Sequence, residues 1–400
     1  MRIVFVTPVS WPALGGRERL LRDVTRALAA RGHQIEVVAR RAATDPPGRL
    51  QRHLGGGALF APFTDGSVRV EPLALPPGRA AALLPLAAAQ GRAGARATEA
   101  AAGRMSAWYA KVVGPLLTPY AARADVIHAW SGGYHAAAAQ VAAARAGVPV
   151  VLTPHLHPGQ WGETPDAVRS YLAADAVTPY LRPEAERLVE LGVAAERVRP
   201  IPACSPGVER DDAAAAALRA RHGLAADAPV VLFLGARRAH KGHDVLRAAA
   251  PLVRAAGRPE AAFVFVGPGA PVGGEGVIDA GEVDDAERAA WLSAADVLCL
   301  PSRFESFGLV VLEAWSAGVP VVAGDAPALR ALVGEAGGGL ATARTPEAVG
   351  DAVLELLGDP ARAMALGDEG RRWWRAHATP AAVAAAHEAL YEGLIAARRG

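Results

Sequence analysis

The stretch "MRIVFVTPVSWPALGGRERLLRDVTRALAARGHQIEVVAR" (residues 1–40) predicts a β-strand, a loop, an α-helix and a second strand. The run "RIVFV" is apolar throughout and "QIEVVAR" is mostly so, as in parallel strands that helices cover on both faces. Between them, "RERLLRDVTRALAARGH" has apolar residues at helical spacing, and the predicted helix stops at Gly32. The stretch therefore predicts a βαβ unit, the repeating element of a doubly wound α/β domain.

Apolar strand-like runs recur along the rest of the chain in two series. The first comprises "DVIHAW" (125–130), "PVVLTPH" (149–155), "DAVTPY" (175–180) and "VRPIPA" (198–203). The second comprises "PVVLFLG" (229–235), "AAFVFVG" (261–267), "GVIDAG" (276–281), "DVLCLP" (296–301) and "PVVAGD" (320–325).

These two series predict an α/β fold of two Rossmann-like, doubly wound domains, residues 1–205 and 206–377, facing across a cleft. The join is expected near "SPGVERDD" (205–212), and a C-terminal helix at about 378–400 is expected to pack back on the first domain. Residues 42–110, where Pro and Gly interrupt the pattern, are expected to be loops and helices added to that domain.

The composition is that of a globular protein: 400 residues, 52% hydrophobic and 20% charged. No apolar run approaches the roughly 20 residues of a membrane-spanning helix, and the N-terminus does not resemble a signal peptide, so a cytoplasmic protein is expected. The net charge of +2 is uneven, with roughly +9 in residues 1–111 and roughly −7 in the remainder. An anionic substrate or the inner membrane surface could meet the basic segment, whereas no nucleic-acid partner is expected.

The segment "PSRFESFGLVVLEAWSAGVPVVA" (301–323) carries the most specific chemistry. Glu305 falls in a predicted loop and Glu313 on the helix that follows it. The start of that helix offers backbone amides at Ser306, Phe307 and Gly308, which favour an anion or a hydroxyl-rich ligand. Two carboxylates without nearby metal-type ligands are suited to accept hydrogen bonds from sugar or ribose hydroxyls.

The pattern "PS..E.FG....EA..AG.PVV" resembles that of the retaining GT-B glycosyltransferases of family 4 (glycosyl transferases group 1). Other fragments fall in that family's order: "GG" (15–16), "ALAARGHQIEVV" (27–38), "VLTPHLHP" (151–158), "AERLVELGV" (185–193), "PGVE" (206–209), "LFLGARRAHKG" (232–242) and "FVFVGPG" (263–269). The resemblance covers nearly the whole chain apart from residues 42–120. It implies a nucleotide-sugar donor held mainly by the second domain and an acceptor held by the first.

The resemblance also implies roles for single residues in the second domain. Glu313 matches the residue that binds the donor's ribose. Glu305 matches one near the donor sugar, beside the backbone amides of Phe307, Gly308 and Leu309. Lys241 matches a phosphate-binding lysine in the loop that opens at Gly235, and it is one of two lysines in the chain, with Lys111.

The family places an arginine directly after that glycine, where this chain has Ala236. Arg237 is our preferred second phosphate ligand, and Arg238 is the alternative.

In the first domain, Gly15 and Gly16 match a glycine loop that approaches the diphosphate, where the lack of a Cβ permits close backbone contact. His155 matches a histidine that reaches the donor sugar and the reaction centre, with His157 and His128 as alternatives.

The implied reaction is a retaining sugar transfer to a hydroxyl-bearing acceptor, which could be a small molecule, a glycan or a lipid-linked compound. The sequence contains no D-x-D triplet and no His, Asp or Glu cluster at metal-ligand spacing, so no cofactor or metal is expected. An epimerase, a phosphorylase or a non-catalytic sugar-nucleotide-binding protein on the same fold are the alternatives. A dinucleotide dehydrogenase is disfavoured, because neither glycine loop spells G-x-G-x-x-G with an acidic residue about 20 positions on.

Overall fold

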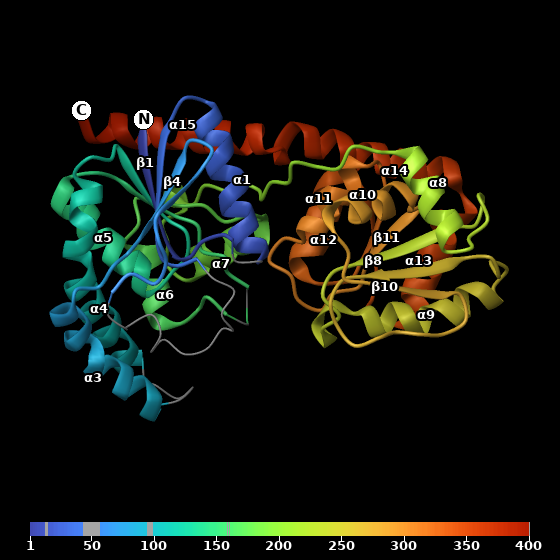
Figure 1. The fold of residues 1–400 in the computed structure, drawn as a ribbon, viewed down its shortest axis with the longest axis horizontal. Coiled ribbons are helices and arrows are strands. Elements are labelled where there is room, and N and C mark those ends of the chain that lie inside the picture. Colours follow the sequence, from blue (N-terminus) through green and yellow to red (C-terminus); the bar gives the residue numbers. More distant parts are fainter. Residues whose placement is uncertain (13–14, 43–56, 94–98, 158, 160, 400) are drawn as a thin grey trace. The chain divides into compact units, whose positions relative to one another are not determined.

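The computed structural model describes residues 1–12, 15–42, 57–93, 99–157, 159 and 161–399. The chain divides into two compact units, one of residues 1–202 and 383–400 and the other of residues 203–382 (Figure 1). Each unit has its own sheet. Both sheets are built on parallel strands, which confirms the α/β, GT-B-like fold expected from the sequence.

The described part of unit 1 contains a seven-stranded sheet of order β3-β4-β2-β1-β5-β6-β7. All neighbouring strands are parallel except the pair β3 and β4. The strands are β1 (Arg2–Val9), β2 (Gln34–Arg41), β3 (Phe63–Asp65), β4 (Val68–Pro72), β5 (Val126–Ala129), β6 (Val150–Leu152) and β7 (Ala176–Val177). The helices are α1 (Gly16–Ala30), α3 (Pro77–Ala93), α4 (Glu99–Ala121), α5 (Tyr134–Ala146), α6 (Pro165–Leu172), α7 (Arg182–Glu190) and α15 (Pro380–Arg399).

Side chains alternate between the two faces of this sheet, and both faces are buried. Val4 and Val6 of β1 join the core that α4 and α5 cover. On β5, His128 is fully buried and bonds Tyr391 of α15 at 2.6 Å, so the C-terminal helix packs back on unit 1.

Two sequence predictions for unit 1 were wrong. Part of the segment 42–110 forms strands β3 and β4, and β4 pairs with β2 in parallel. Residues 43–56 and 94–98 of that segment lie outside the described residues. The run "VRPIPA" (198–203) is not a strand, apart from an isolated bridge between Val177 and Val198. Pro200 and Pro202 have no N–H groups, so the run cannot complete a ladder of hydrogen bonds.

Within the described residues, unit 2 holds a six-stranded parallel sheet of order β10-β9-β8-β11-β12-β13. The strands are β8 (Val230–Leu234), β9 (Ala262–Val266), β10 (Val277–Gly281), β11 (Val297–Leu300), β12 (Val321–Ala323) and β13 (Gly339–Ala341). The helices are α8 (Asp212–Arg221), α9 (His243–Ala255), α10 (Asp285–Ala294), α11 (Leu309–Ser316), α12 (Pro327–Ala336), α13 (Pro346–Gly358) and α14 (Pro360–Trp373).

The strand order reverses once in each sheet. In unit 1 the reversal lies between β1 and β5, and in unit 2 between β8 and β11. The loops leaving two such strands diverge to opposite faces, so the carboxyl ends of the strands open a crevice there that commonly binds ligands. The site residues predicted from the sequence are therefore expected to lie near these two reversals.

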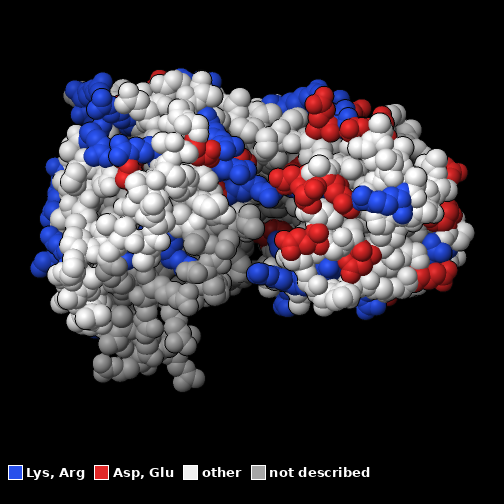
Figure 2. Space-filling model, viewed as in Figure 1, with Lys and Arg blue, Asp and Glu red and all other residues white. Residues whose placement is uncertain are grey.

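The charge asymmetry in the sequence is also visible on the surface. Figure 2 shows Lys and Arg gathered on the face of unit 1 and most of the Asp and Glu on that of unit 2. No helix in the described part of the chain is long and apolar enough to cross a membrane. Cys204 and Cys299 are both buried free thiols.

Candidate active site

In unit 2 the loops that follow β8 and β11 meet at the point where the strand order reverses. Lys241 ends a short 3-10 turn (Ala239–Lys241) after β8, and its Nζ donates to Oε1 of Glu305, in the loop after β11, at 2.5 Å. Ser302 donates to the same carboxylate oxygen at 3.2 Å. The structure therefore brings together two of the predicted site residues, which are 64 positions apart in the sequence.

The backbones of these loops are joined as closely as their side chains. Arg303 N donates to the carbonyl of His240 at 2.7 Å. Gly242 has a left-handed φ of 76°, and a Cβ there would lie 2.0 Å from the carbonyl oxygen of Pro301. Only glycine fits, because a side chain would meet both backbone strain and a backbone atom that cannot move aside. The glycine after Lys241 thus sets the approach of the lysine to the β11 loop.

The second predicted glutamate lies on α11, whose N-cap is Gly308 in the left-handed conformation. Phe307 before it is buried, and Ser306 and Leu309 are half-buried. The first amides of a helix have no partner within the helix, so this end of α11 suits an oxygen-rich ligand. Glu313 is 6% exposed, and its Oε1 accepts a bond from Arg288 of α10 at 2.6 Å.

Arg237 packs against Gly269, in the loop after β9, and its guanidinium bonds Asp279 of β10. Its Nη1 donates to Oδ1 of Asp279 at 2.5 Å, and its side chain is 4% exposed. The Asp279 carboxylate also accepts hydrogen bonds from the backbone amides of Val272 and Gly281. Burial raises the pKa of Asp279, but the two amide bonds and the ion pair with Arg237 outweigh this effect and hold the pKa below its usual value. Arg238 is exposed. Which of the two arginines binds a phosphate stays a prediction, because Lys241, the other predicted phosphate ligand, is likewise paired with a carboxylate.

In unit 1 the predicted glycine loop lies at the end of β1, where α1 begins. Gly15 is the N-cap of α1 and Gly16 is its first residue. A Cβ on Gly15 would lie 1.9 Å from Oε2 of Glu18, whose Oε1 pairs with Arg17 at 2.7 Å. The start of α1 therefore already attracts a carboxylate of the protein, as expected of a helix N-terminus.

His155 follows β6, the strand that neighbours β5 in the sheet. Its Nδ1 lies 2.8 Å from the hydroxyl of Tyr180, and its ring packs edge-on against Trp130. Burial, and then the positive charge of Arg17, lower the pKa of His155 well below its ordinary value. The histidine is therefore a neutral imidazole at neutral pH.

The two alternative histidines are engaged differently. His128 is fully buried, with Nδ1 bonded to Tyr391 at 2.6 Å and Nε2 to Thr153 at 2.8 Å. Both of its ring nitrogens serve the core. The ring of His157 lies against the half-exposed indole of Trp161, with the ring centroids 3.8 Å apart and the planes tilted by 45°.

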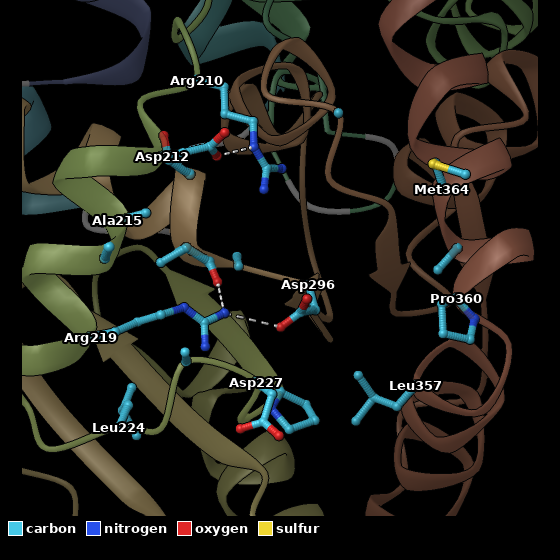
Figure 3. Close-up of a pocket in the computed structure, with 18 of the residues that line it drawn as sticks. Arg210, Asp212, Ala215, Arg219, Leu224, Asp227, Asp296, Leu357, Pro360 and Met364 are labelled. Atoms are coloured by element: carbon cyan, nitrogen blue, oxygen red, sulfur yellow. Dashed lines mark hydrogen bonds and ion pairs between the residues drawn. The ribbon is translucent and has the colours of Figure 1, made fainter.

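A pocket lies elsewhere in unit 2 (Figure 3). It encloses about 750 Å³ and is lined by Arg219, Asp227, Asp296, Pro320 and Met364, among others. Pro229, Asp296 and Pro320 immediately precede β8, β11 and β12, so the pocket is at the amino edge of the sheet. Arg219 is already bonded to the carbonyls of Ala228 and Ala294. Its position opposite the Lys241 edge sets this pocket apart from the candidate site.

Several residues of the site had no signal in the sequence. Arg288 meets Glu313 from a neighbouring helix, Tyr180 meets His155 from the loop after β7, and Arg17 acts on His155 from α1. Each partner depends on how elements pack, which local spacing does not reveal. Among the described side chains, no group of three or more His, Cys, Asp or Glu could hold a metal ion.

Two family models match the chain. The one described as "Glycosyl transferase 4-like domain" matches residues 15–204, and the one described as "Glycosyl transferases group 1" matches residues 228–359. A D-inositol 3-phosphate glycosyltransferase of Xylanimonas cellulosilytica is 31% identical, covering 90% of this chain and 88% of that protein. A phosphatidyl-myo-inositol mannosyltransferase of Propionibacterium freudenreichii is 46% identical over a shorter stretch, which covers 24% of this chain and 26% of that protein.

Solved structures agree on the fold. Anabaena Alr3699/HepE in complex with UDP superposes with a TM-score of 0.70 at 20% identity, covering 99% of this chain and all of that one. Sucrose-phosphate synthase from Thermosynechococcus elongatus superposes with a TM-score of 0.68 at 22% identity, with the same coverage of both chains.

Proposed function

Because the chain belongs to the group 1 glycosyltransferases of family 4 and has their GT-B fold, we propose that it transfers a sugar from a nucleoside-diphosphate sugar to a hydroxyl-bearing acceptor. We further propose that the transfer retains the anomeric configuration and needs no metal ion. The observation that carries this proposal is the pairing of Lys241 with Glu305 where the order of the unit 2 sheet reverses.

Each predicted residue then has a task in holding the donor. Glu313 accepts bonds from the ribose hydroxyls, with Arg288 bonded to the same carboxylate and orienting it. The start of α11 and Glu305 face the donor sugar. Lys241, joined by the exposed Arg238, binds the diphosphate.

In the reaction, the bond from the anomeric carbon to the diphosphate oxygen breaks and a bond from the same carbon to the acceptor oxygen forms on the same face. The acceptor's proton passes to the departing phosphate oxygen. Negative charge grows on that phosphate, and the fixed cation of Lys241 stabilises it, as Mg²⁺ does in metal-dependent transferases. His155, a neutral imidazole, is proposed to act on the donor sugar.

The relatives and the solved structures indicate which ligands to try first. UDP and glucose are bound in an HepE structure, and inositol phosphate is named for several relatives. We propose UDP-glucose as the first donor and a phosphorylated polyol as the first acceptor, because an anionic acceptor suits the basic unit 1.

A thermal-shift panel of UDP, GDP, ADP and their sugars tests the proposal, since a ligand that binds only the folded protein raises the melting temperature by mass action. The donor so identified is then incubated with acceptors, with and without EDTA, and the anomeric coupling of the product is read by NMR. A product of inverted configuration, or transfer abolished by EDTA, would refute the retaining or the metal-free part. Conversion of the donor without acceptor would indicate an epimerase, and a requirement for free phosphate would indicate a phosphorylase.

A further inference from the structure

The backbone of His155 is held in an unfavourable conformation. Among the described residues, His155 is the one non-glycine with a positive φ, 52°. Such a conformation costs about 1 kcal/mol or more and persists only where the surroundings determine it. The contacts that determine it are therefore part of how the site is built.

The first contact fixes the imidazole ring. Tyr180 follows β7, which pairs with β6 in parallel, so the loops that carry Tyr180 and His155 leave the sheet side by side. The tyrosine is 6% exposed, and its hydroxyl lies 2.8 Å from Nδ1. With Nδ1 so held and Trp130 against the ring, the direction of Nε2 is set. Nε2 is buried and bonds no side chain among the described residues, and the backbone of Trp130 also interacts with the imidazole.

The second contact fixes both backbones at once. Glu184 lies in the first turn of α7 and is 4% exposed. Its Oε1 accepts the amide of Leu156, the residue after His155, at 2.7 Å. Its Oε2 accepts the amide of Tyr180 at 2.6 Å. The N-cap residue of α7, Leu181, has no side-chain hydrogen bond, so Glu184 serves as the local cap and also as a bridge to the neighbouring loop.

We propose that Tyr180 and Glu184 are positioning residues of the sugar transfer: the tyrosine hydroxyl donates to Nδ1 of His155, which leaves Nε2–H directed at the substrate, and the two oxygens of the Glu184 carboxyl group hold the two loops in register. The proposal rests on the proposed function for the role of His155. Neither residue touches substrate, and both act through the histidine.

Tyr180→Phe is the decisive variant, because it removes a single hydroxyl and keeps the ring. We expect kcat to fall about 10- to 100-fold, the cost of misplacing a reacting group, while the donor KM changes less than threefold. Tyr109→Phe is the matched control: Tyr109 is fully buried in unit 1 and its hydroxyl also meets a histidine, His135, at 3.1 Å. A kcat of Tyr180→Phe within threefold of wild type, or an equal loss in Tyr109→Phe, would overturn the proposal.

A second readout does not depend on turnover. In protein labelled with ¹⁵N-histidine, the Nδ1 and Nε2 shifts of His155 should indicate an Nε2–H tautomer that changes in Tyr180→Phe and stays the same in Tyr109→Phe. Unchanged shifts in Tyr180→Phe would refute the pairing. If the wild-type protein transferred no sugar from any donor, the proposed function would fail, and these shifts would still decide whether Tyr180 orients His155.

Glu184 is tested by Glu184→Gln, which keeps one carbonyl oxygen but turns an NH₂ group towards an amide that donates. We expect a lower kcat, and faster hydrogen exchange at the amides of Leu156 and Tyr180 than at the amides of β1. Slow exchange at both amides together with wild-type kcat would show that Glu184 does not hold the loops.

Discussion

Replacing Lys241 by alanine separates the lysine's part in catalysis from its part in stability. In the folded protein its ammonium group is the charged partner of Glu305, whose side chain is 9% exposed. In the reaction it is proposed to stabilise the departing diphosphate. The substitution therefore removes a charge from the transition state and leaves a carboxylate largely buried beside Ser302.

The two losses differ in size and in assay. Loss of one fixed charge contact to the leaving group should lower kcat about 100-fold, which corresponds to about 2.7 kcal/mol. Leaving a buried carboxylate without its cation should lower the free energy of unfolding by about 1–3 kcal/mol. Initial rates at saturating donor measure the first loss, and urea unfolding measures the second.

A double variant, Lys241→Ala with Glu305→Gln, distinguishes the two effects. It should recover most of the lost stability, because a neutral amide needs no cation, while its activity stays at or below that of Lys241→Ala. A Lys241→Ala enzyme that turned over within threefold of wild type would refute the role given to this lysine. So would a double variant that regained activity.

The remaining predictions concern other parts of the site. Glu313→Ala should weaken the binding of nucleotide and donor at least tenfold in calorimetry, with a smaller change in kcat, because its carboxylate is proposed to hold the ribose; unchanged affinity would contradict this. Arg238→Ala should lower kcat/KM about 10- to 100-fold. Arg237→Ala should chiefly weaken nucleotide affinity, because it removes the bond to Asp279 of β10. The reverse outcome would identify Arg237 as the phosphate ligand. Burial lowers the pKa of His128 and His155 well below the ordinary value, and it lowers the pKa of His387 to about 3. Below about pH 6.5, each of these histidines therefore binds more protons in the unfolded protein than in the folded protein. Burial raises the pKa of Glu184 to about 8, so between about pH 4.5 and 8 this carboxyl group binds more protons in the folded protein than in the unfolded one. Its effect on the free energy of unfolding is therefore opposite to that of one of the three histidines. The free energy of unfolding should therefore decrease as the pH is lowered from about 6 to 4.5, and in urea titrations His387→Phe should make that decrease less steep than in the wild type; an equal decrease in both proteins would contradict this.

The sequence predicted those parts of the site that depend on strand ends. Runs of apolar residues locate the parallel strands, and loops at the carboxyl ends of adjacent strands must lie together, so Lys241 and Glu305 could be expected to meet. The two strands missed in residues 42–110 are short, of three and five residues, and β4 owes its existence to pairing with β2. Such strands are stabilised by their neighbours more than by their own composition.

The partners of the site residues were harder to predict for a different reason. Arg237 and Arg238 are adjacent, and the sequence shows two equivalent cations near one lysine. The structure distinguishes them, because Arg237 packs against Gly269 and bonds Asp279 on the next strand but one from β8, whereas Arg238 is exposed. Glu184 shows the same limit: its place near the start of a helix predicts a local cap, whereas its bond to Leu156 depends on the packing of two loops.

The pairing with Glu305 also explains why a chain with two lysines keeps one at position 241. An ammonium group carries three donors that point in different directions, so it can keep one bond to Glu305 and direct another at a phosphate. A guanidinium presents its donors in one plane and binds a carboxylate bidentately, as arginines do elsewhere in this protein, for example Arg123 with Glu36. At position 241 an arginine held that way by Glu305 would be turned from the diphosphate. On this reasoning Lys241→Arg keeps the charge and the fold and still loses most of the turnover.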